Sequence, residues 1–196
     1  MNIKYLSILL INSLKSCSQL NKMRVLVFDT ETTGLPKTKI LNKYMLDLWP
    51  HIVQFSYIIF DTESNTIIKL KDCIIKVPDS FIISEDASKI HGITNEISFS
   101  KGVNIAGVLD EFFDDFGNVD HIVGHNISFD KNCLRNVLNY YMLDQPEYKE
   151  HCTYNIYGES LDKCCYRYKI ELNHHNALSD AKACASLFLL HLNNNE

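Results

Sequence analysis

The sequence predicts an α/β domain in which a single mixed β-sheet carries helices on its faces. Three runs of β-branched and aromatic residues, typical of buried strands, lie before residue 78. Apolar residues at helical spacing then dominate, interrupted by short strand-like runs. A length of 196 residues suits one well-cored domain and is too short for two ordinary ones.

The predicted strands are short and bounded by turn residues. The first ends before Gly34 and Pro36, and the second and third flank a turn-like stretch, so they predict a hairpin. The predicted strands are 24–30, 52–60, 66–77, 121–124 and 152–156.

Helices are predicted where cap residues precede apolar residues spaced three and four apart. Ser84 and Ser160 are expected to cap two of them, and Gly92 to end the first. Segment 37–50 is expected to be a loop with some helical character. The predicted helices are 84–90, 103–116, 128–143, 160–168 and 179–192.

The first 22 residues are predicted to be an extension before a domain of residues 23–196. Within this extension, the stretch from Tyr5 to Leu14 is apolar and follows Lys4, as in a weak signal sequence. No clear small-residue cleavage site follows it. Met23 stands directly before the first strand and is an alternative start. No run reaches the ~18 apolar residues that a membrane-spanning helix needs, so no membrane association is expected.

Charge and cysteine content restrict the possible functions. The net charge of -5 argues against binding nucleic acid through overall charge, but a carboxylate site can still contact phosphate through divalent cations. An odd number of cysteines, without a CxxC pair, favours a reducing intracellular compartment over secretion. A zinc site of Cys152, Cys164, Cys165 and a histidine would match no zinc spacing pattern.

The first segment with chemical potential is Asp29-Thr30-Glu31, at the end of the first predicted strand. Because strand side chains alternate, Asp29 and Glu31 point the same way. Two carboxylates on one face repel each other unless a cation lies between them, and oxygen ligands favour Mg²⁺ or Mn²⁺. A solvated strand end is the alternative interpretation of this segment alone.

Two later segments carry an aspartate at a helix start. Gly124 to Asp130 (GHNISFD) leads from a short strand into a helix, and His175 to Ala181 (HNALSDA) leads into the last helix. Each aspartate alone fits the preference of carboxylates for helix N-termini, and His175 alone fits an ordinary loop histidine. The three segments together change this interpretation.

In this order, the three segments resemble the three exonuclease motifs of the DEDDh (DnaQ-like) superfamily, typified by the proofreading ε subunit of bacterial DNA polymerase III. The strings ETTGL, GHNxxFD and HxAxxDA carry the resemblance, and Ile90 to Thr94 (IHGIT) matches a string between its first and second motifs. The resemblance extends from about Arg24 to Leu192. It implies a ribonuclease H-like fold with a five-stranded mixed sheet flanked by helices.

The resemblance also implies a mechanism and the residues that perform it. Two Mg²⁺ or Mn²⁺ ions would be held by four carboxylates, and His175 would be the general base. His174 is one residue too far from the last aspartate for that role. The implied metal ligands, which are also catalytic, are Asp29, Glu31, Asp130 and Asp180.

By the same resemblance, the substrate is the 3′ end of a single-stranded or frayed nucleic acid. DNA is favoured over RNA, and a polymerase or repair partner would be a separate chain. The sequence leaves monomer and homodimer open, and a catalytically silent nucleic-acid-binding module is the rival of a different class. The implied substrate contacts are Thr32, Thr33, Leu35, His91, Asn126 and Phe129, with a core position as the alternative for Leu35 and Phe129.

Overall fold

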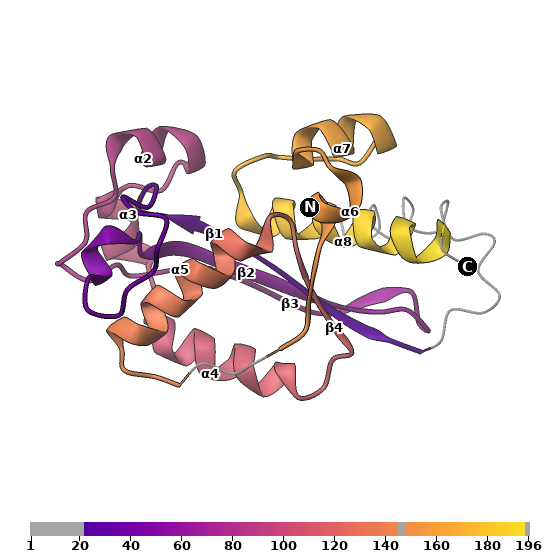
Figure 1. The fold of residues 1–196 in the computed structure, drawn as a ribbon, viewed down its shortest axis with the longest axis horizontal. Helices are drawn as coiled ribbons and strands as arrows, with labels where there is room; N and C mark the ends of the chain where they lie inside the picture. Colours follow the sequence, from indigo (N-terminus) through magenta and orange to yellow (C-terminus); the bar gives the residue numbers. More distant parts are fainter. Residues whose placement is uncertain (1–21, 145–147, 195–196) are drawn as a thin grey trace.

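The computed structural model describes residues 22–144 and 148–194 as one five-stranded mixed sheet flanked by helices (Figure 1). The predicted fold class is therefore confirmed. Residues 1–21 of the predicted N-terminal extension lie outside the described residues. Within the described residues, no helix is both long and apolar enough to cross a bilayer.

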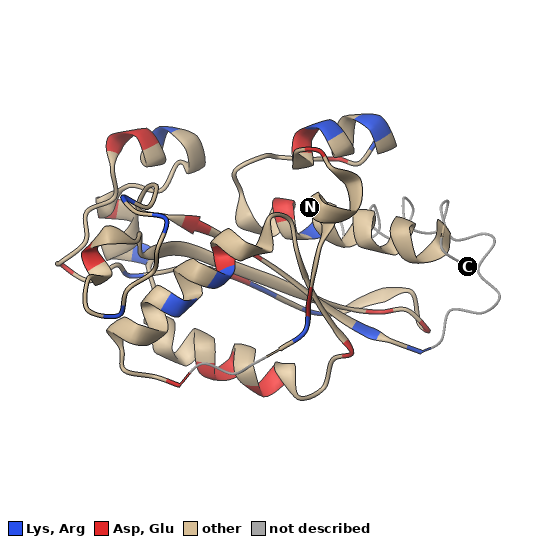
Figure 2. Ribbon diagram, viewed as in Figure 1, with Lys and Arg blue, Asp and Glu red and all other residues tan. Residues whose placement is uncertain are grey.

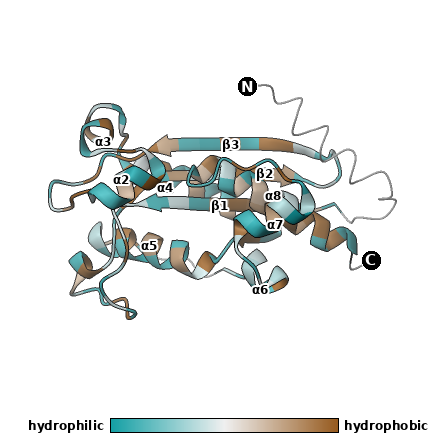
Figure 3. Ribbon diagram, turned by 90° about the horizontal axis from the view of Figure 1, so that it is seen from above, coloured by the Kyte–Doolittle hydropathy of each residue, from teal (hydrophilic) through white to brown (hydrophobic). Residues whose placement is uncertain are grey.

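The sheet has the strand order β3-β2-β1-β4-β5. The predicted hairpin forms from β2 and β3, and β2 also pairs antiparallel with β1, whereas β4 and β5 extend the sheet in parallel. Figure 3 shows β3, β2 and β1 side by side, with β3 at the outer edge. The strands are β1 (Arg24–Thr32), β2 (Ile52–Asp61), β3 (Thr66–Ile74), β4 (His121–Gly124) and β5 (Glu150–Cys152).

Helices cover both faces of the sheet. On one face, α8 packs on β1, β2 and β4, and on the other face α4 and α5 enclose the larger apolar core. The cap residues Ser84 and Gly92 bound α2 as predicted. The helical elements are η1 (Leu46–Leu48), α2 (Glu85–His91), α3 (Asn95–Lys101), α4 (Ile105–Phe116), α5 (Ile127–Tyr140), α6 (Thr153–Tyr157), α7 (Leu161–Tyr168) and α8 (Ala177–Asn194).

One predicted strand needs correction, and one helix was not predicted. The segment 152–156 is not a strand: parallel pairing with β4 stops at Cys152, opposite Gly124, and the chain then turns into α6. The buried Thr153 hydroxyl contacts His125 there, and Gly158 ends the helix in a left-handed conformation with φ 71°. In addition, α3 was missed, although the Thr94 side chain caps it by accepting a hydrogen bond from the Ile97 amide.

The turn from β4 into α5 fixes the second motif beside the first. Gly124 is required there because a Cβ at this position would lie 2.9 Å from Ile127 side-chain atoms. Asn126 then adopts a left-handed conformation with φ 54°, which asparagine tolerates better than most residues. The carboxyl ends of β1 and β4 are parallel neighbours, so α5 starts close to the end of β1.

Candidate active site

The alternation of side chains along β1 divides the candidate residues between two faces. Val25 and Val27 pack under α8, whereas Leu26 and Phe28 pack against α4 and α5. By the same alternation, Asp29 and Glu31 continue the face under α8, and Thr30 continues the face toward α5.

Three carboxylates from two distant segments meet under α8. Oxygen atoms of Asp29, Glu31 and Asp180 lie within 4.8 Å of one another. Figure 2 shows acidic residues at the end of β1, early in α5 and early in α8. The Oδ1 atom of Asp180 is buried and has no hydrogen-bond partner in the described part of the chain. Such a buried acceptor is costly unless a cation or a proton occupies the site.

The start of α8 is held in place by capping groups. The Asn176 side chain accepts a hydrogen bond from the Ser179 amide at 3.1 Å, and its carbonyl accepts from the Asp180 amide at 2.9 Å. The backbone amide of His175 donates to Asp180 Oδ2 at 3.2 Å, and φ of 65° at His175 makes this geometry possible. These contacts hold one oxygen of Asp180 and leave the other free.

Asp130 takes a different position from the other three carboxylates. Its Oδ1 atom accepts two hydrogen bonds from Thr30, one from the backbone amide at 3.0 Å and one from the hydroxyl at 2.7 Å. Asp130 is 4% exposed, and it does not belong to the group within 4.8 Å. Its charge nevertheless acts on Asp29 more strongly than that of any other carboxylate.

The pKa values of all four carboxylates are raised, and repulsion from neighbouring carboxylates contributes for Asp29, Glu31 and Asp130. Burial is the largest cause for each, followed for Asp29 by the charges of the other three. Burial and repulsion raise the pKa of Glu31 to about 8. The pKa of Asp130 rises to about 7, although its hydrogen bonds from Thr30 lower it, and that of Asp180 rises to about 6.

Two adjacent histidines stand beside Asp180. The rings of His174 and His175 are stacked with centroids 3.9 Å apart, and both side chains offer a nitrogen within 4.8 Å of an Asp180 oxygen. His174 Nε2 lies 3.9 Å from Asp180 Oδ2. Burial and the neighbouring His174 lower the pKa of His175, so its neutral form is favoured.

His91 belongs to the same neighbourhood. Its Nδ1 accepts from the Ile93 amide, so the proton is on Nε2, which donates to the Thr32 carbonyl at 3.1 Å. Burial is the main cause that lowers the pKa of His91, and the charge of His175 adds to it. His91 therefore ties α2 to the end of β1.

The remaining predicted substrate residues surround this position. Thr33 exchanges hydrogen bonds with His51, since its amide donates to the His51 carbonyl and its hydroxyl accepts from the His51 amide. Leu35 is 84% exposed, so the core alternative for it is wrong, whereas Phe129 is half-buried against the core. Thr32 is buried and Asn126 is exposed.

Gln54 was missed by the sequence analysis. It is 5% exposed and lies opposite Glu31 in the register of β1 and β2. Its Oε1 accepts from the Ala177 amide at 3.2 Å, and its Nε2 donates to Asp72 on β3 at 2.8 Å. Gln54 therefore connects the start of α8 to the sheet. A polar residue inside the apolar run IVQFSYIIF was the signal that could have identified it.

The donor set fits hard divalent cations. Two groups of described residues could hold a metal ion, and neither contains a cysteine. The predicted zinc alternative therefore has no support, and the six described cysteines are free thiols. Carboxylate oxygens with one uncommitted buried acceptor are the ligands that Mg²⁺ and Mn²⁺ prefer.

Comparison with known proteins agrees with this geometry. The RNase T family model, described as an exonuclease family, matches residues 26–188. DNA polymerase III subunit epsilon of Buchnera aphidicola subsp. Schizaphis graminum is 28% identical over 187 residues, which cover 87% of this chain and 75% of the relative. The corresponding protein of Buchnera aphidicola subsp. Acyrthosiphon pisum is also 28% identical, over 189 residues.

Solved structures share the fold. Apo Exonuclease I superposes with a TM-score of 0.67 at 20% identity over 87% of this chain, which spans only 42% of Exonuclease I. Exonuclease X, solved with 5′-overhanging duplex DNA, gives a TM-score of 0.61 at 22% identity over 88% of this chain and 92% of its own length. With the family model matching most of its length, this chain belongs to the RNase T exonuclease family of DnaQ-like 3′–5′ exonucleases.

Proposed function

We propose that this chain is a metal-dependent exonuclease that releases nucleoside monophosphates from the 3′ end of single-stranded or frayed DNA. One observation carries the proposal: three carboxylates lie within 4.8 Å of one another, and one of their oxygens is buried without a partner among residues 22–144 and 148–194. Family membership supplies the reaction class, and this cluster supplies the place where the reaction occurs.

Asp29, Glu31 and Asp180 would hold the cations, with Asp130 at the edge of the group. Their raised pKa values fit this role, because a cation removes the repulsion that favours protonation. When bound, two divalent ions supply charge neutralisation, an activated water and stabilisation of the leaving 3′ oxygen.

His175 is proposed to accept the proton of the attacking water at a ring nitrogen. Its lowered pKa keeps the imidazole neutral and ready to accept a proton near pH 7. Asp180 Oδ2, which accepts from the His175 amide, fixes the backbone that carries this imidazole. His174 points to the same carboxylate, so it is the matched control for His175.

The terminal nucleotide is proposed to bind against the end of β1 and the loop that follows it. Leu35, which is 84% exposed beside the site, offers an apolar contact for a base. His91 Nε2 donates to the Thr32 carbonyl and so keeps this segment in position. Thr33 and His51 hold the same segment from the other side through two hydrogen bonds.

DNA is favoured over RNA because the matching relatives are subunits of a DNA polymerase. The same relatives suggest a separate polymerase as partner. A time course with 5′-labelled and 3′-labelled oligomers of DNA and RNA tests the proposal. With Mg²⁺ or Mn²⁺, the 5′-labelled DNA should shorten stepwise, and the 3′-labelled DNA should release labelled mononucleotide at once.

Two outcomes would count against the proposal. Activity that persists in EDTA would show that the reaction needs no metal. Faster degradation of RNA than of DNA would show that RNA is the preferred substrate. A catalytically silent binding module would show no product with any metal. That alternative does not explain why Asp180 Oδ1 is buried without a hydrogen-bond partner in the part of the chain that the structure describes.

A further inference from the structure

The proposed mechanism assigns no role to His174, although this residue lies beside the proposed base. It belongs to the loop that joins α7 to α8 (Figure 1). His174, His175 and Asp180 form a group that could hold a metal ion, because one ligand atom of each lies within 4.8 Å of the others. This group shares only Asp180 with the carboxylate cluster, so it is a second candidate metal site with different ligands.

The backbone on both sides of His174 is anchored to the start of α8. The Asn173 amide donates to the Ser179 hydroxyl at 2.8 Å, and the His175 amide donates to Asp180 Oδ2 at 3.2 Å. Both acceptors lie in the first turn of α8. The two anchored amides hold the loop so that both imidazoles stay beside the Asp180 carboxylate.

The two oxygens of Asp180 have different surroundings. Oδ2 accepts from the His175 amide and lies 3.9 Å from His174 Nε2, whereas Oδ1 has no hydrogen-bond partner among the described residues. Asp180 is 5% exposed, but the His174 side chain is 38% exposed and His175 is also exposed. An ion at the histidines would therefore be reachable from solvent and would be held from below by a buried carboxylate.

These ligands favour a different cation from that of the carboxylate cluster. Imidazole nitrogen suits Zn²⁺, whereas Mg²⁺ prefers oxygen ligands. Two histidines and one carboxylate, with water in the fourth position, form an open zinc site, and this set contains none of the cysteines. Ligand atoms of a tetrahedral zinc lie about 3.3 Å apart, so the stacked rings must tilt toward each other. Their exposure leaves room for this movement.

We propose that His174, His175 and Asp180 form an inhibitory site for Zn²⁺. A ring bound to zinc cannot accept a proton at the bound nitrogen, and the charge of the ion makes the other nitrogen a weaker base. Zinc would therefore remove His175 from its proposed role in activating the attacking water. The inhibitory effect rests on the proposed function, whereas the binding of zinc does not.

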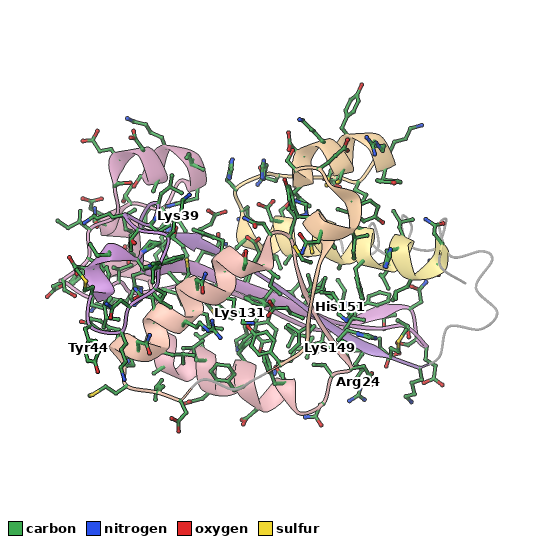
Figure 4. The ribbon with its side chains drawn as sticks, viewed as in Figure 1. Arg24, Lys39, Tyr44, Lys131, Lys149 and His151 are labelled. Carbon is green, nitrogen blue, oxygen red and sulfur yellow. The ribbon has the colours of Figure 1, made fainter. Side chains whose placement is uncertain are left out.

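The histidine pair His121 and His151 provides a matched control in the same chain. His121 Nδ1 lies 2.9 Å from His151 Nε2, but this pair belongs to neither group that could hold a metal ion in the described part of the chain. Figure 4 shows His151 near Lys149, whose charge adds to burial and to the charge of His121 in lowering the pKa of His151. His151→Ala therefore disrupts a histidine pair without changing the proposed zinc site.

The first test measures binding without substrate, with saturating Mg²⁺ at the carboxylate cluster. Calorimetric titration should show one Zn²⁺ bound with equal affinity by the wild type and His151→Ala. His174→Ala should bind it at least about 10-fold more weakly, since even losing a group that only orients a ligand costs about 10–100-fold in metal affinity. Co²⁺ used in place of Zn²⁺ should give the visible absorption of a four-coordinate ion, which His174→Ala should lose.

The second test measures hydrolysis of a single-stranded DNA decamer in saturating Mg²⁺ with increasing Zn²⁺. Half-inhibition of the wild type and of His151→Ala should occur at the same zinc concentration. His174→Ala should need at least about 10-fold more, in step with its weaker binding. The zinc-free rate of His174→Ala, close to that of the wild type, shows that the variant is folded, and His174→Gln repeats the comparison with a polar side chain.

Three results would overturn the inference. They are a wild type that binds no zinc in saturating Mg²⁺, equal zinc affinities of the wild type and both His174 variants, and equal inhibition of these proteins despite different affinities. A wild type that binds zinc through His174 but hydrolyses no DNA in zinc-free Mg²⁺ would confirm the zinc site and overturn the proposed function.

Discussion

The two faces of β1 differ in how their carboxylates are held at the candidate site. Under α8, Asp29 and Glu31 meet Asp180, whose Oδ1 has no partner among the described residues. Toward α5, Asp130 is held by two hydrogen bonds from Thr30, which lies between the other two on the same strand. One face is therefore a set of ligands that lacks a counter-charge, and the other is a carboxylate already positioned by the protein.

This difference indicates a division of work. We expect the face under α8 to depend on cations for its stability, and the position of Asp130 to depend on its two hydrogen bonds from Thr30. Because the strand period is two, a single strand serves both faces with three consecutive residues. Substitutions on one face can therefore be compared with substitutions on the other.

The largest effect is expected from Asp29→Asn. Removing this charge should lower exonuclease activity by more than ~10⁴-fold, because cation binding is lost with it. The same change should raise the melting temperature of the metal-free protein, since it removes repulsion among buried carboxylates. Activity assays and thermal melts in EDTA check both signs, and a fall in the metal-free melting temperature would contradict the account.

His175→Ala should have the next largest effect. Loss of a general base lowers the rate by about 10²–10⁴-fold. His174→Ala should stay within about 3-fold of the wild type, since it removes a ring that stacks on His175 but leaves the proposed base in place. The measurement is the hydrolysis rate of both variants in saturating Mn²⁺. If His174→Ala lost activity and His175→Ala retained it, the general base would be His174.

Thr30→Val tests the opposite face of β1. Valine keeps the shape but removes the hydroxyl donor to Asp130, so activity should fall by about 10–100-fold, as expected for a hydrogen bond to a charged group worth about 1.5–3 kcal/mol. Thr30→Ser keeps the donor and should restore most of the activity. A valine variant as active as the serine variant would show that the hydroxyl does not position Asp130.

The smallest effect is a pH-dependent change in stability. The carboxyl pKa values of Glu31 and Asp180 rise to about 8 and about 6 in the folded, metal-free protein, so the folded state holds these protons more tightly than the unfolded chain. The free energy of unfolding should therefore fall as pH rises from about 4 to 8 in EDTA. Mg²⁺ should remove this fall, and a melting temperature that rises with pH in EDTA would contradict the sign.

The sequence predicted which carboxylates share a face of the sheet, but not how the distant segments meet. The shared face of Asp29 and Glu31 followed from strand alternation, and the helices that begin near Asp130 and Asp180 followed from apolar residues at helical spacing. The convergence of these groups was implied by family resemblance, because no local sequence pattern links residues that lie 50 or more positions apart.

Contacts between distant segments escaped the sequence analysis for the same reason. Thr30 appeared only as the residue between two acids, yet its bonds to Asp130 span 100 positions. Gln54 reaches Ala177 across 123 positions. The short helix Thr153–Tyr157 was predicted as a strand because its residues are typical of strands. The reasons that it is a helix are tertiary: β4 ends opposite Cys152, and Thr153 is buried where the chain turns.

Titration of Mn²⁺ into the metal-free protein, followed by calorimetry, tests the central claim most directly. We expect the wild type to bind two ions, and we expect Asp29→Asn, still folded by circular dichroism, to lose this binding. Failure of the wild type to bind Mn²⁺, or equal binding by both proteins, would contradict it.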